Sequence, residues 1–149
     1  MIWYEYIIPA LIGFFAAVIG FVAMEFWVRP ARAIQNEIYQ IGGNIYFYSN
    51  VWRTERVNEA RLAFRGHAQV LLTRMLQLGW RYRVLARLFG LPTKQKLVEG
   101  IRRLTGLSNH NPDEPHVATL TERVNEIREA LGLADLLDAW GEIKKNLEE

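Results

Sequence analysis

The chain begins with a long apolar stretch. Tyr6–Val28 contains one charged residue, Glu25, near its end. At about 1.5 Å per residue, a helix over this stretch is roughly 34 Å long, enough to cross a hydrocarbon core of about 30 Å. Lipid offers the backbone no hydrogen-bond partners, so such a segment has to be helical. The pattern predicts one transmembrane helix near the N-terminus, within an anchor over residues 1–29.

The flanks of this stretch predict its orientation. Trp3 and Tyr4 precede it and Trp27 lies at its end, as in the aromatic belts of membrane interfaces. Arg29 and Arg32 follow it, so the positive-inside rule places the C-terminal part in the cytoplasm. Two alternatives are a cleaved signal peptide, which has a basic start and a shorter apolar run, and the core helix of a soluble protein.

Small residues at helical spacing lie on one face of the predicted span. Such a face lets two helix backbones approach closely in lipid. It predicts a transmembrane contact with a second copy or a partner protein. The residues are Gly13, Ala16, Ala17 and Gly20.

A heptad pattern follows Pro30, a residue expected to kink or restart the helix. The pattern has two interpretations: a seam that joins copies of the chain, or one buried face of an intramolecular helical bundle. Gly42 and Gly43 weaken the helix by about 2 kcal/mol. The seam residues, which follow Ala31, are Ile34, Ile38, Ile41, Ile45, Tyr48 and Trp52.

The remaining chain shows only helical periodicity, without the alternation of strands. The sequence therefore predicts an all-α protein, with the anchor followed by a small helical-bundle domain over residues 30–149. We expect Thr93 to cap one helix and Gly106 to end it. The predicted helices cover Thr54–Leu78, Trp80–Phe89, Lys94–Leu104, Val117–Leu131 and Leu133–Leu147.

The second of these helices is short, basic and aromatic. Such a helix can lie in a membrane interface with its arginines on anionic headgroups. The alternative is an ordinary bundle helix with a solvated arginine face. The residues predicted to bind an anionic surface are Trp80, Arg81, Arg83 and Arg87.

Charge is unevenly distributed along the 149 residues, although the formal net charge is only +2. Twelve Lys and Arg face three Glu between Arg53 and Arg103, whereas ten Asp and Glu face four basic residues from Asp113 onward. The basic middle and acidic tail can attract each other, within one chain or between copies. Nucleic acid is a further partner for the basic, aromatic middle.

Residues with catalytic potential are few. The chain has no cysteine, which excludes disulfides, thiol catalysis and thiolate metal sites. No phosphate-binding loop, dinucleotide fingerprint or zinc-protease motif occurs. We expect no cofactor, no metal site and no catalytic residue, with His67 a packed or interfacial histidine on an apolar helix face. The densest group of possible metal ligands lies in a predicted loop: His110, Asp113, Glu114 and His116.

The segment Gly90–Asn109 carries a Leu-Pro pair near its start and Gly-Leu-Ser-Asn at its end. It resembles a segment of uncharacterised small bacterial membrane-anchored helical proteins. The resemblance implies a prokaryotic source and the same layout of anchor and helical domain. It implies no activity, cofactor or catalytic residue.

Together these features predict a membrane-anchored, non-enzymatic subunit or scaffold of a membrane-associated assembly. The sequence leaves two alternatives. One is a basic binding module for an anionic membrane surface or nucleic acid. The other is a membrane effector or regulator controlled by a partner protein.

Overall fold

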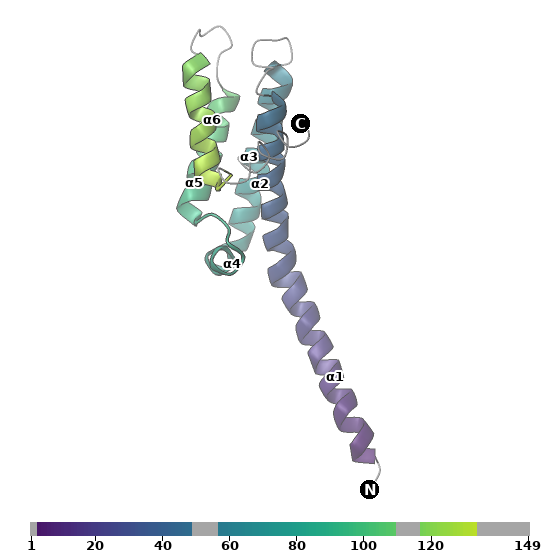
Figure 1. Ribbon diagram of the computed structural model, residues 1–149. Coiled ribbons are helices and arrows are strands. Elements are labelled where there is room, and N and C mark those ends of the chain that lie inside the picture. Colours follow the sequence, from purple (N-terminus) through teal and green to yellow (C-terminus); the bar gives the residue numbers. More distant parts are fainter. Residues whose placement is uncertain (1–2, 49–56, 110–116, 134–149) are drawn as a thin grey trace, which may run out of the picture.

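The computed structural model describes residues 3–48, 57–109 and 117–133 of the chain (Figure 1). Within these ranges every regular element is a helix, and no strand occurs. The all-helical prediction is therefore confirmed. The elements are α1 (Trp3–Ala23), η1 (Met24–Val28), α2 (Arg29–Tyr48), α3 (Val57–Leu78), α4 (Arg81–Phe89), α5 (Lys94–Ser108) and α6 (Val117–Leu131).

One helix without a break joins the N-terminal element to the rest of the protein. Elements α1, η1 and α2 follow each other directly, and α1 extends alone beyond the other helices (Figure 1). The continuous helix Tyr6–Tyr48 contains a stretch long and apolar enough to cross a membrane, and this stretch is not buried by the protein. A signal sequence near an N-terminus meets the same criteria of length and composition.

The other helices form what we call the helical body, which comprises α2 to α6. Helices α2, α3, α5 and α6 lie alongside one another, whereas α4 crosses one end of them (Figure 1). The main packing runs from α2 to α3, from α3 to α5 and from α5 to α6. Apolar side chains of each helix of the body, α2 to α6, meet in a shared core. Ile41, Phe64, Leu85, Leu104 and Ile127 are among the fully buried ones.

Three glycines with positive φ end helices of the body. Gly79, Gly90 and Gly132 follow α3, α4 and α6, with φ of 53°, 64° and 69°. Glycine adopts this left-handed conformation without the penalty that a Cβ imposes. The predicted ends of α4 and α6 at these positions are confirmed.

The end of α5 differs from the prediction. Thr93 caps the helix as expected, since its hydroxyl accepts a hydrogen bond from the Lys96 amide. Gly106 does not end the helix, which continues to Ser108. Burial of Leu107 stabilises this last turn, and the Ser108 carbonyl accepts a hydrogen bond from Arg61 Nε at 3.0 Å. These tertiary contacts outweigh the weak helix propensity of glycine.

An ionic cluster joins α5 to α6. Arg103 donates to Glu99 one turn earlier, at 2.6 Å, and also to Glu126 on α6. The hydrogen bond to Glu99, with support from Glu126, raises the pKa of the Arg103 guanidinium above its ordinary value. The cluster is half-exposed, so it aligns the two helices while adding little to the free energy of unfolding.

Candidate functional site

The end of the helical body nearest α1 begins at a π-helical turn. The Arg29 amide bonds the Met24 carbonyl, five residues earlier. Pro30 follows; it lacks an N–H, and its ring crowds the carbonyl four residues before it. A wider π turn relieves this crowding without breaking the helix. Pro30 therefore bends the helix where α1 leaves the axis of α2, and does not start a new one (Figure 1).

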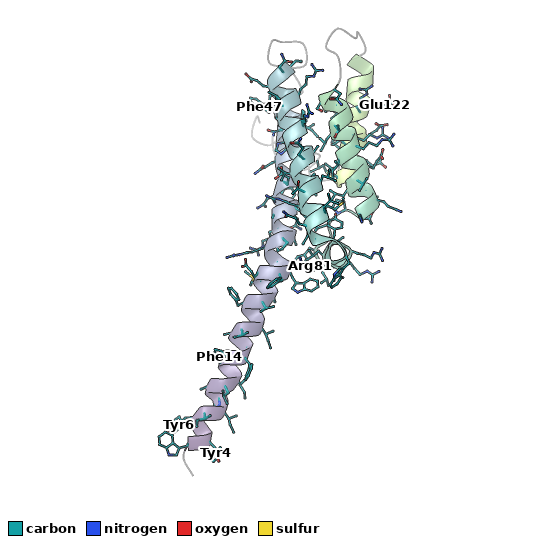
Figure 2. All side chains as sticks on the ribbon, turned by 180° about the vertical axis from the view of Figure 1, so that it is seen from behind. Tyr4, Tyr6, Phe14, Phe47, Arg81 and Glu122 are labelled. Atoms are coloured by element: carbon teal, nitrogen blue, oxygen red, sulfur yellow. The ribbon has the colours of Figure 1, made fainter. Side chains whose placement is uncertain are left out.

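The same turn marks the boundary between bare helix and packed helix. Side chains of α1, including the labelled Tyr4, Tyr6 and Phe14, project with no other element beside them (Figure 2). Trp27 is the first side chain to pack against the core, and Ala31 is the first to be fully buried. Glu25 and Arg29, one on each side of Trp27 in the sequence, form an ion pair at 2.6 Å on the surface of this turn. The exposed apolar helix therefore gives way to a packed helix within this one turn.

Helix α4 is held at this end by two hydrogen bonds to backbone carbonyls. Gln35 Nε2 of α2 donates to the carbonyl of Phe89 at 3.0 Å. The Tyr82 hydroxyl donates to the carbonyl of Pro92 at 2.6 Å. Tyr82 and Leu85 are fully buried, and burial raises the pKa of the Tyr82 phenol to about 12. These contacts hold α4 firmly across the end of the body.

The outward face of α4 divides into an apolar and a basic side. Trp80, just before the helix, is 74% exposed, and Val84 and Leu88 follow it at intervals of four residues with 36% and 67% exposed. Arg83 and Arg87, also four residues apart, are exposed beside them. A spacing of four places side chains above one another on a helix. The face therefore presents an apolar line next to a pair of guanidinium groups.

A buried polar group lies inside the body, between α2 and α3. His67 Nδ1 lies 2.7 Å from Glu37 Oε1, and His67 Nε2 lies 2.6 Å from the Asn44 side-chain amide. These distances fit a ring that donates to the carboxylate through Nδ1 and accepts from the amide through Nε2. Nearby, Arg74 of α3 donates to the Ala33 carbonyl of α2. Pairing satisfies groups that are costly to bury, and it defines how α2 is rotated against α3.

His67, predicted to be packed or interfacial on an apolar helix face, is packed, since its side chain is 14% exposed. Its partner Glu37 was not predicted. A carboxylate between Ile34 and Ile38 of the heptad pattern was the available signal, because a charged residue at such a position needs a partner.

The predicted site residues lie in three regions. The small residues Gly13, Ala16, Ala17 and Gly20 lie on α1, exposed and away from the body. The four seam isoleucines, Ile34, Ile38, Ile41 and Ile45, are buried in the core of the same chain, and Tyr48 packs edge-on against Phe64. Trp52 lies outside the described residues. Association of copies through this seam stays a prediction.

Of the four residues predicted to bind an anionic surface, Trp80, Arg83 and Arg87 share the outward face of α4. Arg81 is half-buried and lies at the end of the body nearest α1 (Figure 2). The possible metal ligands His110, Asp113, Glu114 and His116 lie outside the described ranges. Within those ranges no three His, Asp or Glu side chains gather closely enough to hold a metal ion.

No family model, curated protein or solved structure matches this chain.

Proposed function

We propose that this chain is a membrane-anchored protein. Residues 1–29 cross a bilayer once, and the helical body serves as a non-enzymatic subunit or scaffold of a membrane-associated assembly on the cytoplasmic side. One observation carries the proposal. In a single continuous helix, the part over α1 is apolar on all sides and exposed, whereas the part over α2 packs one face into the core.

The energetic cost of leaving α1 in water supports the anchor. Exposing one large apolar side chain costs on the order of 1.5–3 kcal/mol relative to burial, so ten of them cost roughly 15 kcal/mol or more. That matches or exceeds the whole stability of a typical domain, about 5–15 kcal/mol. Lipid removes this cost. The exposed side chains are Ile7, Ile8, Leu11, Ile12, Phe14, Phe15, Val18, Ile19, Phe21 and Val22.

The polar contacts of α2 support a scaffold. Glu37 with His67, Arg74 with the Ala33 carbonyl, and Gln35 with the Phe89 carbonyl tie α2 to both α3 and α4. A helix tied at several points cannot rotate or slide freely against its neighbours. The span then holds the body at a set height and rotation, and a helix–helix contact within the bilayer orients the attached bodies.

The anchor is tested by charged substitutions on α1. Ile12→Arg with Ile19→Arg places two cations in the span, at about 2.5–3.5 kcal/mol each near its centre. We expect this variant to leave the membrane fraction on alkaline carbonate washing, with its body still folded, because neither side chain touches the body. Leu62→Arg, an equally exposed site on α3, is the control and stays with the membrane. Retention of the double variant contradicts the anchor.

Assembly through α1 is tested by native mass in a mild detergent. An added Cβ at Gly13 or Gly20 meets nothing within 4 Å, so larger residues there leave a single chain undisturbed. We expect the wild type to form a defined oligomer or to retain a partner, and Gly13→Ile with Gly20→Ile to lose it. Val22→Phe, on the opposite face of α1, is the control. A wild type that is strictly monomeric and without a partner contradicts the scaffold role.

A further inference from the structure

We infer that α4 lies in the headgroup layer of the bilayer and binds anionic lipid through its outward face. The inference rests on the proposed function, because α1 has to cross the bilayer for α4 to meet it. It assigns a lipid surface as the partner of one defined helix, beyond the anchor itself.

The direction of α4 suits such a role. Figure 1 shows α4 along its own axis, whereas α2, α3, α5 and α6 run along the length of the body. A helix that crosses the direction of the span lies in the plane of the membrane. Interfacial amphipathic helices adopt this orientation.

The height of α4 also suits it. The bond from Gln35 to the Phe89 carbonyl places the end of α4 beside a residue seven positions beyond Val28. That corresponds to roughly 10 Å along the helix axis, and a helix with its side chains has a radius of about 5–6 Å. The polar layer of a bilayer is about 5–8 Å thick on each side. The outer side chains of α4 therefore reach this layer once Val28 lies at the edge of the hydrocarbon.

The chemistry of the outward face matches a lipid surface. Trp80 and Leu88 are largely exposed to water, where apolar side chains are unfavourable and from which the headgroup boundary removes them. Arg83 and Arg87 lie beside this apolar line. When Trp80 and Leu88 insert into the headgroup boundary, the guanidinium groups of Arg83 and Arg87 therefore reach the lipid phosphates. Tryptophan also prefers the interface, because its ring is apolar and its N–H is polar.

Further basic residues surround α4 at the same end of the body. Arg32 lies at the start of α2, next to the ion pair of Arg29 with Glu25, and exposed Lys94 and Lys96 lie at the start of α5, just after α4. By contrast, Glu122 on α6 lies at the opposite end of the body (Figure 2). The cations around α4 that are unpaired among the described residues add to Arg83 and Arg87, as binding to the anionic lipid of the cytoplasmic leaflet requires.

The absence of cysteine gives a direct test with the full chain. Leu88→Cys, Ile12→Cys and Arg102→Cys each provide a single site for a nitroxide label, all at exposed positions. The three proteins are placed in nanodiscs of phosphatidylcholine with phosphatidylglycerol, and in discs of phosphatidylcholine alone. Accessibility of the label to oxygen and to a water-soluble nickel chelate reports its depth.

We expect the label at Ile12 to be deep in lipid and the label at Arg102, on α5, to be in water. The label at Leu88 should show a severalfold higher ratio of oxygen to chelate accessibility than the label at Arg102. The ratio should be greatest in discs with phosphatidylglycerol. A Leu88 label in water beside a deep Ile12 label overturns the inference and leaves the anchor intact. An Ile12 label in water overturns the anchor.

The role of the arginines is tested in the same discs. Arg83→Gln with Arg87→Gln should move the Leu88 label toward water in discs with phosphatidylglycerol. The control, Arg65→Gln with Arg102→Gln, removes the same charge at exposed positions of α3 and α5 and should leave the label in place. Equal effects of the two pairs overturn the assignment of lipid to α4.

Discussion

Helices α1 and α2 are nearly equal in length, with 21 and 20 residues, and they follow one another in one continuous helix. In α1 apolar residues occupy all sides, and the described side chains are all exposed. In α2 the isoleucines occupy one buried face, whereas the other face mixes polar residues with the exposed aromatic side chains of Tyr39, Tyr46 and Phe47. A helix with apolar side chains on all sides is suited to an apolar environment that surrounds it, whereas a helix with apolar side chains on one face is suited to packing against a protein neighbour.

The two helices also differ in their polar contacts with the rest of the protein. Residues in α2 bond to α3 and α4 through Gln35, Glu37, Asn44 and the Ala33 carbonyl. The main contacts of α1 are with η1, which continues the same helix, and its described side chains are exposed, so in a bilayer van der Waals packing and close approach have to position α1. Substitutions in the two halves should therefore affect different quantities: the stability of the body for α2, and membrane retention or assembly for α1.

The largest contrast is expected between one isoleucine of α2 and one of α1. Ile41 is fully buried and Ile12 is 63% exposed. Ile41→Ala should lower the free energy of unfolding by about 2–5 kcal/mol, through lost burial and a cavity. Ile12→Ala should leave it unchanged. Denaturant unfolding in detergent, followed by circular dichroism, measures both, and equal losses would remove the distinction between the two halves.

The next contrast concerns the buried polar group. His67→Leu leaves the Glu37 carboxylate buried without its partner, so we expect a loss of about 1–3 kcal/mol in unfolding free energy. Glu37→Leu should cost a similar amount. The double variant should cost less than the sum of the two, because it leaves neither group unpaired. Strictly additive losses would show that the pair does not couple α2 to α3.

Two adjacent glycines of α2 differ in the space around them, so substitutions at these neighbouring positions should change stability in opposite directions. A Cβ at Gly42 would meet Leu133 Cδ2 at 3.2 Å, whereas a Cβ at Gly43 meets nothing within 4 Å. Gly42→Val should therefore destabilise the body by about 1–3 kcal/mol through overpacking. Gly43→Ala should stabilise it by about 0.5–1 kcal/mol through helix propensity. Thermal unfolding gives both signs; the same sign for both would mean that α2 is not packed against Leu133.

The smallest effect is expected at Tyr82 and depends on pH. Burial raises the pKa of its phenol from 10.0 to about 12, so the folded state favours the neutral form. The unfolded chain ionises first, so this contribution is intact below pH 10 and is lost as pH rises toward 12. At pH 8, Tyr82→Phe should cost about 1 kcal/mol for the hydrogen bond to Pro92. At pH 11 the cost should shrink, since the wild type alone has lost about 1 kcal/mol to ionisation. A cost that does not change with pH would contradict a buried neutral phenol.

The sequence predicted the faces of helices better than their partners. Heptad spacing identified Ile34, Ile38, Ile41 and Ile45 as one face, because helical periodicity is local. It left open whether that face meets another helix of the same chain or a second copy. The structure places α3 there, and such a choice depends on contacts between distant residues that no local pattern encodes.

Two features of the candidate site depended on tertiary structure. The composition of α4 pointed to its basic face, but its crosswise direction follows from the bond between Gln35 and the Phe89 carbonyl, 54 residues apart. The predicted end of α5 at Gly106 was wrong, because the burial of Leu107 and the hydrogen bond to the Ser108 carbonyl extend the helix and no local pattern encodes these contacts. Local glycine signals succeeded where φ is positive and failed where distant packing continues the helix.

The most direct test of the comparison is a nitroxide scan along the continuous helix, with single cysteines from residue 6 to residue 48 in nanodiscs. Every position of α1 should be more accessible to oxygen than to a water-soluble nickel chelate. Past the π-helical turn, accessibility should follow the helical period, with the face of Ile34, Ile38 and Ile41 shielded from both reagents and the opposite face open to the chelate. A water-accessible face along α1, or the same periodic pattern in both halves, would contradict the account.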